Sequence, residues 1–294
     1  MGRDTDILEQ ILAPKDLRPW ILTAVHRRDD RGGSVVVELP EVRPSIQIFL
    51  ADDYWLRTAR DPQGWRRAPR VGLWGPRLNW GYGYAKARIE VFAIGLTPQG
   101  VRALTDQSVG ALIDRVAGLS DLNARLASAL VRIATTHATL PARAGAAFLL
   151  LRSLLPQQPP VSRIGDVLQA MAAQEHCSIS RAAAQLDLSD RQFRRLFRTQ
   201  YGVAPKLYQR ALRLDRALRA LHPQPWEKHR AGETIDYADQ SHMIREFLSL
   251  TGLTPQSYIR NKRRHGDKLL RTVIVEGIAP PHAARRRPFA ERGR

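Results

Sequence analysis

The sequence predicts an α+β fold: an N-terminal small β barrel or sandwich with a helical segment, then a C-terminal all-α domain of two helix-turn-helix units joined by a long helix. Three observations predict this class. Segments rich in β-branched residues occupy the N-terminal third, helical periodicity follows Pro98, and the spacing F-x4-G-x2-P-x2-Y occurs twice in the C-terminal half. The chain has 294 residues and 44% hydrophobic content, enough for two domains. We expect them at residues 1–155 and 161–264, followed by a basic, flexible tail at residues 265–294.

The N-terminal region contains four segments that we expect to be strands. Alternation of apolar and polar side chains and β-branched content favour a small β barrel or sandwich. The expected strands are residues 34–39, 45–50, 71–74 and 89–94. Helical patterns follow at residues 98–104, 109–117, 120–135 and 141–155. A proline-rich run at residues 156–160 is the expected hinge between the domains.

The first copy of the repeat ends a segment that has two faces at helical spacing. One face carries four arginines: Arg191, Arg194, Arg195 and Arg198. The opposite face is apolar and consists of Phe193, Leu196 and Phe197. Such a helix can pack on a core while it presents a row of guanidinium groups to solvent.

The residues around this helix predict its ends and a partner helix. Ser189 suits the N-cap, and Gly202 suits the C-terminal end. Residues 178–186 predict a short alanine-rich helix, in which Ala183 is small enough for a close helix crossing. Asp187 suits the turn because aspartate tolerates the left-handed backbone conformation. The segment is therefore a helix-turn-helix in outline.

The second copy of the repeat lies fifty residues on and follows the phrase DQSHMIREF at residues 239–247. Residues 205–221 predict the joining helix. With these motifs, residues 161–264 resemble the DNA-binding domain of the AraC/XylS family of bacterial transcriptional regulators, in which a long helix joins two helix-turn-helix units. About 16 residues at 1.5 Å each span roughly 24 Å, which would suit two reading heads over successive major grooves about 34 Å apart.

The resemblance implies double-stranded DNA as a partner, bound by one reading helix in each unit. It also implies which side chains face the base edges. These are Arg191, Arg194 and Arg195 of the first helix, and Gln240, Ser241, His242 and Arg245 of the second. Arginine pairs with guanine O6 and N7, and glutamine pairs with adenine. Phosphate contacts, which position the protein without reading sequence, are expected from Arg198, Lys206 and Arg210. Taken alone, a row of arginines is typical of a solvated helix face. Because the motif is repeated, we favour a DNA-binding face.

The supporting helix of the second unit departs from the family pattern. It is expected at residues 226–236, which carry little apolar surface. Gly232 stands where the family has a close-packing alanine, and Asp236 stands where it has a turn glycine. Glycine costs a helix roughly 1 kcal/mol relative to alanine. We therefore expect the first unit to supply most of the affinity.

The N-terminal region resembles the β-rich regulatory domains of some family members, through Leu17 to Trp20 and the turn at residues 95–100. This implies small-molecule sensing, homodimer formation or both, and RNA polymerase is a further candidate partner. The candidate effector pocket is lined by Trp65, Trp74, Trp80, Tyr82 and Tyr84, although aromatic residues in strands more often form plain core. Leucine stripes on the last two N-terminal helices suit a dimer interface and packing onto the β region equally well.

Composition narrows the class of protein. The formal net charge is +18, from 46 Lys and Arg against 28 Asp and Glu, which suits DNA binding. A single cysteine excludes an intrachain disulfide and suits the cytoplasm. The N-terminus does not have the pattern of a signal peptide, and no apolar run is long enough to predict a membrane span. Paired-histidine spacing is absent, so we expect neither a metal nor a cofactor.

The sequence thus predicts a cytoplasmic, sequence-specific transcriptional regulator that reads two successive major grooves. The alternative is an architectural or non-specific DNA-binding protein, which the charge and the basic tail would equally suit. An enzyme with a DNA-binding module is disfavoured, because the G-x-S-x-G, P-loop and C-x-x-C motifs are all absent.

Overall fold

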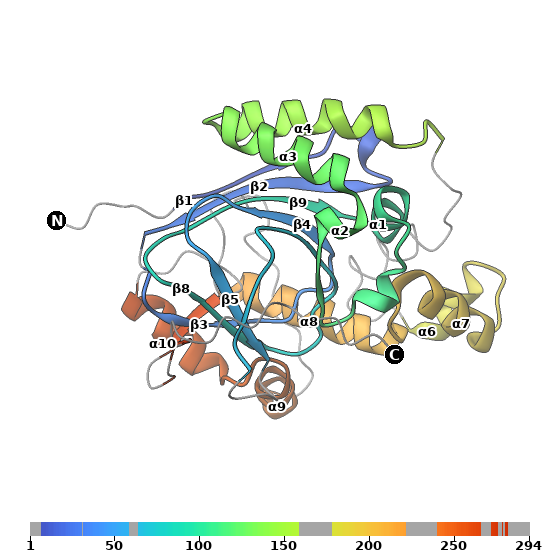
Figure 1. Ribbon diagram of the computed structural model, residues 1–294. Helices are drawn as coiled ribbons and strands as arrows, with labels where there is room; N and C mark the ends of the chain where they lie inside the picture. The colour runs from blue at the N-terminus through green and yellow to red at the C-terminus, as the bar shows by residue number, and fades with distance from the viewer. Residues whose placement is uncertain are drawn as a thin grey trace.

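The chain forms four layers in the residues that the computed structural model describes, which are 7–30, 32–58, 64–158, 178–221, 240–265, 272–275, 278 and 280–281. Two antiparallel sheets face each other, and helices cover both outer faces (Figure 1). On one side lie α3 (Ala124–Thr136) and α4 (Leu140–Leu154). On the other lie α8 (Pro205–Leu221), α9 (Gln240–Thr251) and α10 (Pro255–His265). The predicted α+β class is confirmed, with a sandwich as its β part.

The two sheets contain the predicted strands and several more. The six-stranded sheet has the order β1 (Ile7–Leu12), β2 (Ile21–Asp29), β9 (Ile89–Leu96), β4 (Ser45–Phe49), β7 (Val71–Trp74) and β10 (Val116–Gly118). The five-stranded sheet has the order β11 (Thr272–Val275), β3 (Val35–Glu38), β8 (Gly81–Ala85), β5 (Tyr54–Thr58) and β6 (Arg66–Arg67). The four expected strands correspond to β3, β4, β7 and β9. The sequence analysis missed the aromatic strand β5 and the strand β8, which alternates glycine with tyrosine, and it also missed β1 and β2.

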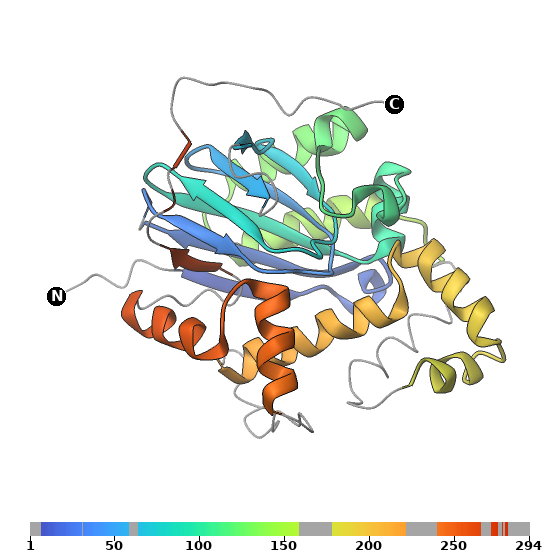
Figure 2. The ribbon, with the colours of Figure 1, turned by 90° about the horizontal axis from the view of Figure 1, so that it is seen from below.

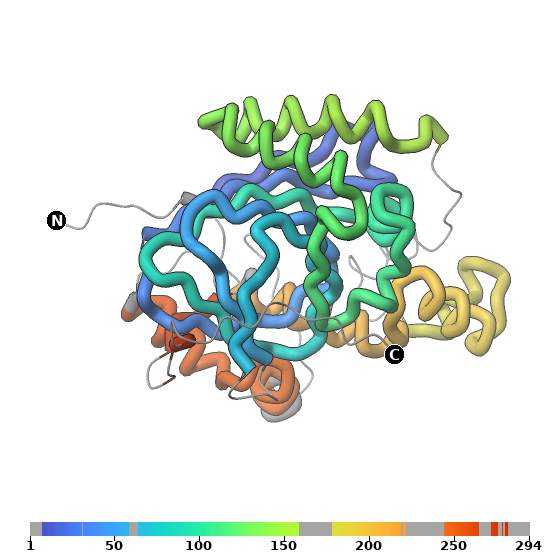
Figure 3. Tube along the Cα trace, in the orientation of Figure 1, coloured from blue at the N-terminus to red at the C-terminus, as the bar shows by residue number. Residues whose placement is uncertain are grey.

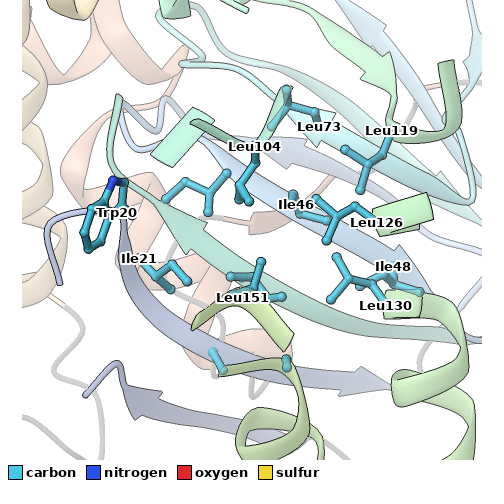
Figure 4. Packing of buried hydrophobic residues seen from close by; sticks show 14 of the residues in the cluster. Trp20, Ile21, Ile46, Ile48, Leu73, Leu104, Leu119, Leu126, Leu130 and Leu151 are labelled. Atoms are coloured by element: carbon cyan, nitrogen blue, oxygen red, sulfur yellow. The ribbon is translucent and has the colours of Figure 1, made fainter. Parts of the chain in front are cut away.

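Helices α3 and α4 pack on the six-stranded sheet through the largest apolar cluster among the described residues (Figure 4). Ile46 and Ile48 of β4 are fully buried there, together with Leu130 of α3 and Leu151 of α4. The guanidinium of Arg143 on α4 also lies 3.6 Å from the carboxylate of Glu90 on β9. The buried leucines of these helices therefore pack onto the β domain. Leu149 and Leu154 of the same stripes are exposed, so the dimer interface stays a prediction.

The segment between β9 and α3 is more broken than predicted. It contains α1 (Pro98–Thr105), the 3-10 helix η2 (Val109–Leu112), β10 and α2 (Leu119–Leu122). Elsewhere in the chain, another 3-10 helix, η1 (Lys15–Leu17), precedes β2. The predicted helix at residues 109–117 is wrong, because Asp114 adopts a left-handed backbone with φ of 53° and Val116 begins a strand that pairs with β7. The predicted helix at residues 120–135 is interrupted by Asn123, whose side chain caps α3.

The outer face of the five-stranded sheet meets the C-terminal helices. A shared apolar cluster joins Val37 and Leu39 of the sheet region to Leu218 of α8, Phe247 of α9 and Tyr258 of α10. Figure 2 views the molecule from below, with α8, α9 and α10 lying beside the edge of the sheet that β11 and β3 form. The N-terminal β region and the C-terminal helices thus share part of one core.

Part of the predicted flexible tail belongs to that sheet. Residues Thr272–Val275 form β11, which pairs antiparallel with β3. Val273 is fully buried, and the Lys262 ammonium of α10 donates to the carbonyl of Thr272. The prediction of flexibility is wrong for these four residues, since their β-branched side chains complete the sheet edge.

Candidate nucleic-acid interface

The first helix-turn-helix unit consists of α6 (Ile179–Ala184) and α7 (Asp190–Tyr201), which project from the side of the molecule (Figure 3). Ser178 caps α6, and its side chain accepts from the backbone N–H of Arg181 at 3.0 Å. Asp187 lies in the turn with φ of 56°, and Ala183 is buried between the helices. The predicted turn conformation and the predicted small residue are both confirmed.

Helix α7, the first reading helix, begins and ends as the sequence predicts. Ser189 and Gln192 form a reciprocal capping box at its N-terminus, in which the Gln192 side chain accepts from the Ser189 N–H at 2.9 Å. Gly202 ends the helix in the left-handed conformation, with φ of 73°. These two caps fix the ends of the helix that carries the arginine row.

The arginine row lies on one exposed face of α7. A surface hollow of about 660 Å³ follows this face and is lined by Asp190, Arg191, Arg194, Arg195, Arg198 and Thr199. The only acidic side chain in the hollow, Asp190, lies 3.8 Å from the guanidinium of Arg194. Three or more guanidinium groups on one solvent-facing surface create a positive potential that suits phosphates and base edges.

The opposite face of α7 packs into a core that belongs mainly to the first unit. Phe193 and Phe197 are fully buried, and Phe197 stacks on Tyr201 with ring centroids 4.9 Å apart. Tyr208 of α8 lies edge-on to Phe197 at 5.6 Å. Burial raises the pKa of Tyr208 to about 12 and also raises the pKa of Tyr201, so both phenols are neutral at physiological pH.

A close backbone contact seats the first unit on the N-terminal region. Gly202 lies directly against Gly110 of η2, and a Cβ on Gly202 would come within 2.4 Å of the Gly110 Cα. Leu78 and Ile113 pack against the edge of the first unit's core. The orientation of the first reading helix is therefore set from its C-terminal end.

The second unit is described from α9, the second reading helix, onward. The carboxylate of Glu246 on α9 is buried and accepts from Arg210 Nε at 2.9 Å and from Arg213 Nη2 at 3.1 Å. Both arginines belong to α8, so this group ties the joining helix to the second reading helix. Arg210 thus makes an internal ion pair, and its expected phosphate contact stays a prediction.

The remaining predicted DNA contacts occupy the expected elements. Gln240, Ser241 and His242 form the first turn of α9, and their side chains lie outside the described residues. Arg245 is exposed on α9, and Lys206 is exposed in the first turn of α8. The supporting helix expected at residues 226–236 also lies outside the described residues. These assignments stay predictions.

The five aromatic residues of the candidate effector pocket divide between two places. Trp65, Tyr82 and Tyr84 gather with the guanidinium of Arg57, which lies 4.3 Å from the Tyr82 ring centroid. Trp80 packs edge-on to Tyr82 at 5.4 Å. Trp74 instead belongs to a separate buried cluster with Phe49 and Tyr54. The structure thus groups four of the five residues, and the pocket itself stays a prediction.

The described residues contain neither a group of three or more side chains arranged to hold a metal ion nor a helix long and apolar enough to span a membrane. The strongest candidate for a functional site is the surface of α7, because it carries a row of four exposed arginines.

Comparison with known families identifies the C-terminal region. Residues 182–261 match the family described as "Helix-turn-helix domain". This region is an AraC-type helix-turn-helix domain. The match begins in α6 and ends in α10, so the AraC-type domain includes both reading helices and the joining helix.

Relatives of the chain agree with this domain. The chain is 29% identical over 110 residues to an uncharacterized HTH-type transcriptional regulator, YidL of Escherichia coli (strain K12), and the match spans 37% of each chain. Among solved structures, it is similar to ToxT from Vibrio cholerae O395, with 9% identity, a TM-score of 0.43, and coverage of 81% of this chain and 96% of ToxT. It is also similar to the C-terminal domain of the response regulator yesN from Fusobacterium nucleatum, with 20% identity, a TM-score of 0.28, and coverage of 33% and 99%. Both TM-scores are low, so neither likeness determines a function.

Proposed function

We propose that this protein is a sequence-specific DNA-binding transcriptional regulator that reads two successive major grooves with α7 and α9. The observation that carries the proposal is the exposed arginine face of α7 within an AraC-type domain. An exposed helix face with several guanidinium groups suits the major groove, where arginine reads guanine. The second reading helix and the helix α8 that joins the two units support a bipartite site.

The proposal is tested by replacing two arginines of the first reading helix. In the double variant Arg194→Ala and Arg195→Ala, we expect specific affinity for a DNA site selected from a random pool to fall at least about 30-fold, since each bidentate contact to a base contributes about 1–3 kcal/mol. Both side chains are exposed, so the fold should be retained. The measurement is a gel shift or fluorescence anisotropy in the presence of competitor DNA.

A matched control removes the same charge from a distant surface. Arg125 and Arg132 are exposed on α3, on the far side of the sandwich. Their double alanine variant should bind the selected site like the unchanged protein. Equal losses in the two variants would favour the architectural alternative, in which only net charge matters, and unchanged specific binding without Arg194 and Arg195 would refute the assignment.

Modulation by a small molecule through the N-terminal domain is a finer part of the proposal. Its support is the direct packing of α8 and α9 on the five-stranded sheet, since a ligand that shifts that sheet would also shift the second reading helix. A screen of the full-length chain against metabolites by thermal shift, followed by DNA binding with each hit, tests it. A ligand that raises the Tm without changing DNA affinity would contradict modulation. The proposal also includes two protein contacts, which are homodimer formation and contact with RNA polymerase.

A further inference from the structure

The two reading helices carry different chemistry at equivalent positions. Because the repeat has a constant offset of fifty residues, Ile244 of α9 corresponds to Arg194 of α7, and Leu248 corresponds to Arg198. Arg245 corresponds to Arg195 and is the one arginine of the row that the second copy retains. Two guanidinium groups of the first reading face are thus replaced by two branched aliphatic side chains.

Ile244 and Leu248 point away from the core of their unit. They are 40% and 45% exposed, whereas Phe247 between them is 2% exposed. Because they are four residues apart in one helix, they lie one turn apart on the same face. The core of the second unit is filled by other residues, including Phe247, Leu250 and Tyr258. Among the residues of the unit that the structure describes, packing therefore does not account for the two exposed aliphatic side chains.

We propose that the second reading helix recognises thymine, through contact of Ile244 with a 5-methyl group in the major groove. The inference rests on the proposed function, because it assumes that α9 enters a groove as α7 does. Of the four bases, only thymine presents a methyl group in the major groove, and apolar side chains are its usual partners. An isoleucine can neither donate to guanine nor bind a phosphate, so the position that reads guanine in one unit reads a methyl group in the other.

The proposal predicts an asymmetric DNA site. The half contacted by α7 should contain guanines, read by Arg191, Arg194 and Arg195, and the half contacted by α9 should contain thymines. Leu248 also stands where the first helix has Arg198, a residue placed for phosphate contact. The second half should therefore contribute less of the salt-dependent affinity.

The experiment uses the full-length chain and a DNA site selected from a random pool. Thymines in the α9 half are replaced one at a time by deoxyuridine, which lacks only the 5-methyl group. At the contacted position we expect affinity to fall about fourfold, the value of one buried methyl-sized group. The variant Ile244→Ala should bind more weakly than the unchanged protein and should no longer distinguish thymine from deoxyuridine there. Replacement of thymines in the α7 half, or the variant Leu12→Ala on exposed β1, should leave this discrimination intact.

A second variant, Ile244→Arg, restores the residue of the first copy. Selection with this variant should change the preferred base in the α9 half from thymine to guanine. If the unchanged protein binds its selected site specifically but tolerates deoxyuridine throughout the α9 half, the thymine proposal is wrong while the proposed function stands, and the aliphatic pair would then suit a protein partner. If no selected DNA is bound specifically, the proposed function itself fails, and this inference fails with it.

Discussion

The two helix-turn-helix units share a sequence pattern, yet they obtain their stability from different parts of the molecule. The first unit builds most of its own core from Phe193, Phe197 and Tyr201, and it touches the N-terminal region mainly at its edge. The second unit shares its core with the five-stranded sheet, where Val37 and Leu39 contact its helices.

The difference indicates how a signal from the N-terminal domain would reach DNA. Because the apolar cluster around Phe247 is continuous with the sheet, a change in β3 alters the packing of the second reading helix directly. The first reading helix has no comparable core on the sheet within the described residues. The first unit is thus suited to supply constant affinity for DNA. The second unit is suited to change its DNA contact when the N-terminal domain changes.

The largest test of this comparison is the variant Leu39→Ala. Leu39 is fully buried in the cluster that it shares with the second unit, so its truncation should destabilise the chain by about 2–5 kcal/mol. Amide hydrogen exchange of the full-length protein should show lost protection in α9 and little change in α7. Equal loss in both helices would indicate that the two units unfold together, against the comparison. The control Leu12→Ala, at a residue that is 61% exposed, should change stability by less than about 0.5 kcal/mol.

A pair of glycine variants compares how the C-terminal ends of the two reading helices are held. Gly202 and Gly252 both have positive φ, 73° and 71°, so alanine strains the backbone at each by about 1–2 kcal/mol. A Cβ at Gly202 would also strike the Gly110 backbone, whereas a Cβ at Gly252 would come within 2.9 Å of the Trp80 ring, a side chain that can shift. Gly202→Ala should therefore cost more, roughly 2–4 kcal/mol. Denaturant unfolding of both variants measures the difference, and an equal or reversed order would show that the Gly110 contact does not hold the first unit.

The smallest expected effect concerns the salt dependence of DNA binding. Arg198→Ala should reduce the slope of log affinity against log salt by about 0.9, the value of one lost phosphate contact on duplex DNA. Leu248→Ala, at the equivalent position of the second helix, should leave the slope unchanged. Titrations at several salt concentrations on one DNA site measure both slopes. A reduced slope for Leu248→Ala would show that the two helices do not dock in equivalent ways.

Local signals in the sequence predicted the first unit well. The N-cap at Ser189, the left-handed Asp187 and the terminal Gly202 depend on residues within a few positions of one another, so sequence alone reveals them. The same reasoning was wrong for residues 109–117, where a long-range pairing with β7 competes with helical periodicity. It also overlooked the ion pair between Arg210 and Glu246, since the pair joins residues 36 positions apart.

The sequence by itself determined where the first reading helix begins and ends, which faces of α7 are basic and apolar, and that the pattern is used twice. These properties follow from side-chain periodicity and capping, which act over one or two helical turns. Only the tertiary structure decided that α9 shares a core with β3, that Thr272–Val275 complete the sheet, and that Ile244 and Leu248 face outward. Burial depends on which distant segments meet, and apolar side chains such as Leu218 and Leu248 look alike in the sequence although one is fully buried and the other is exposed.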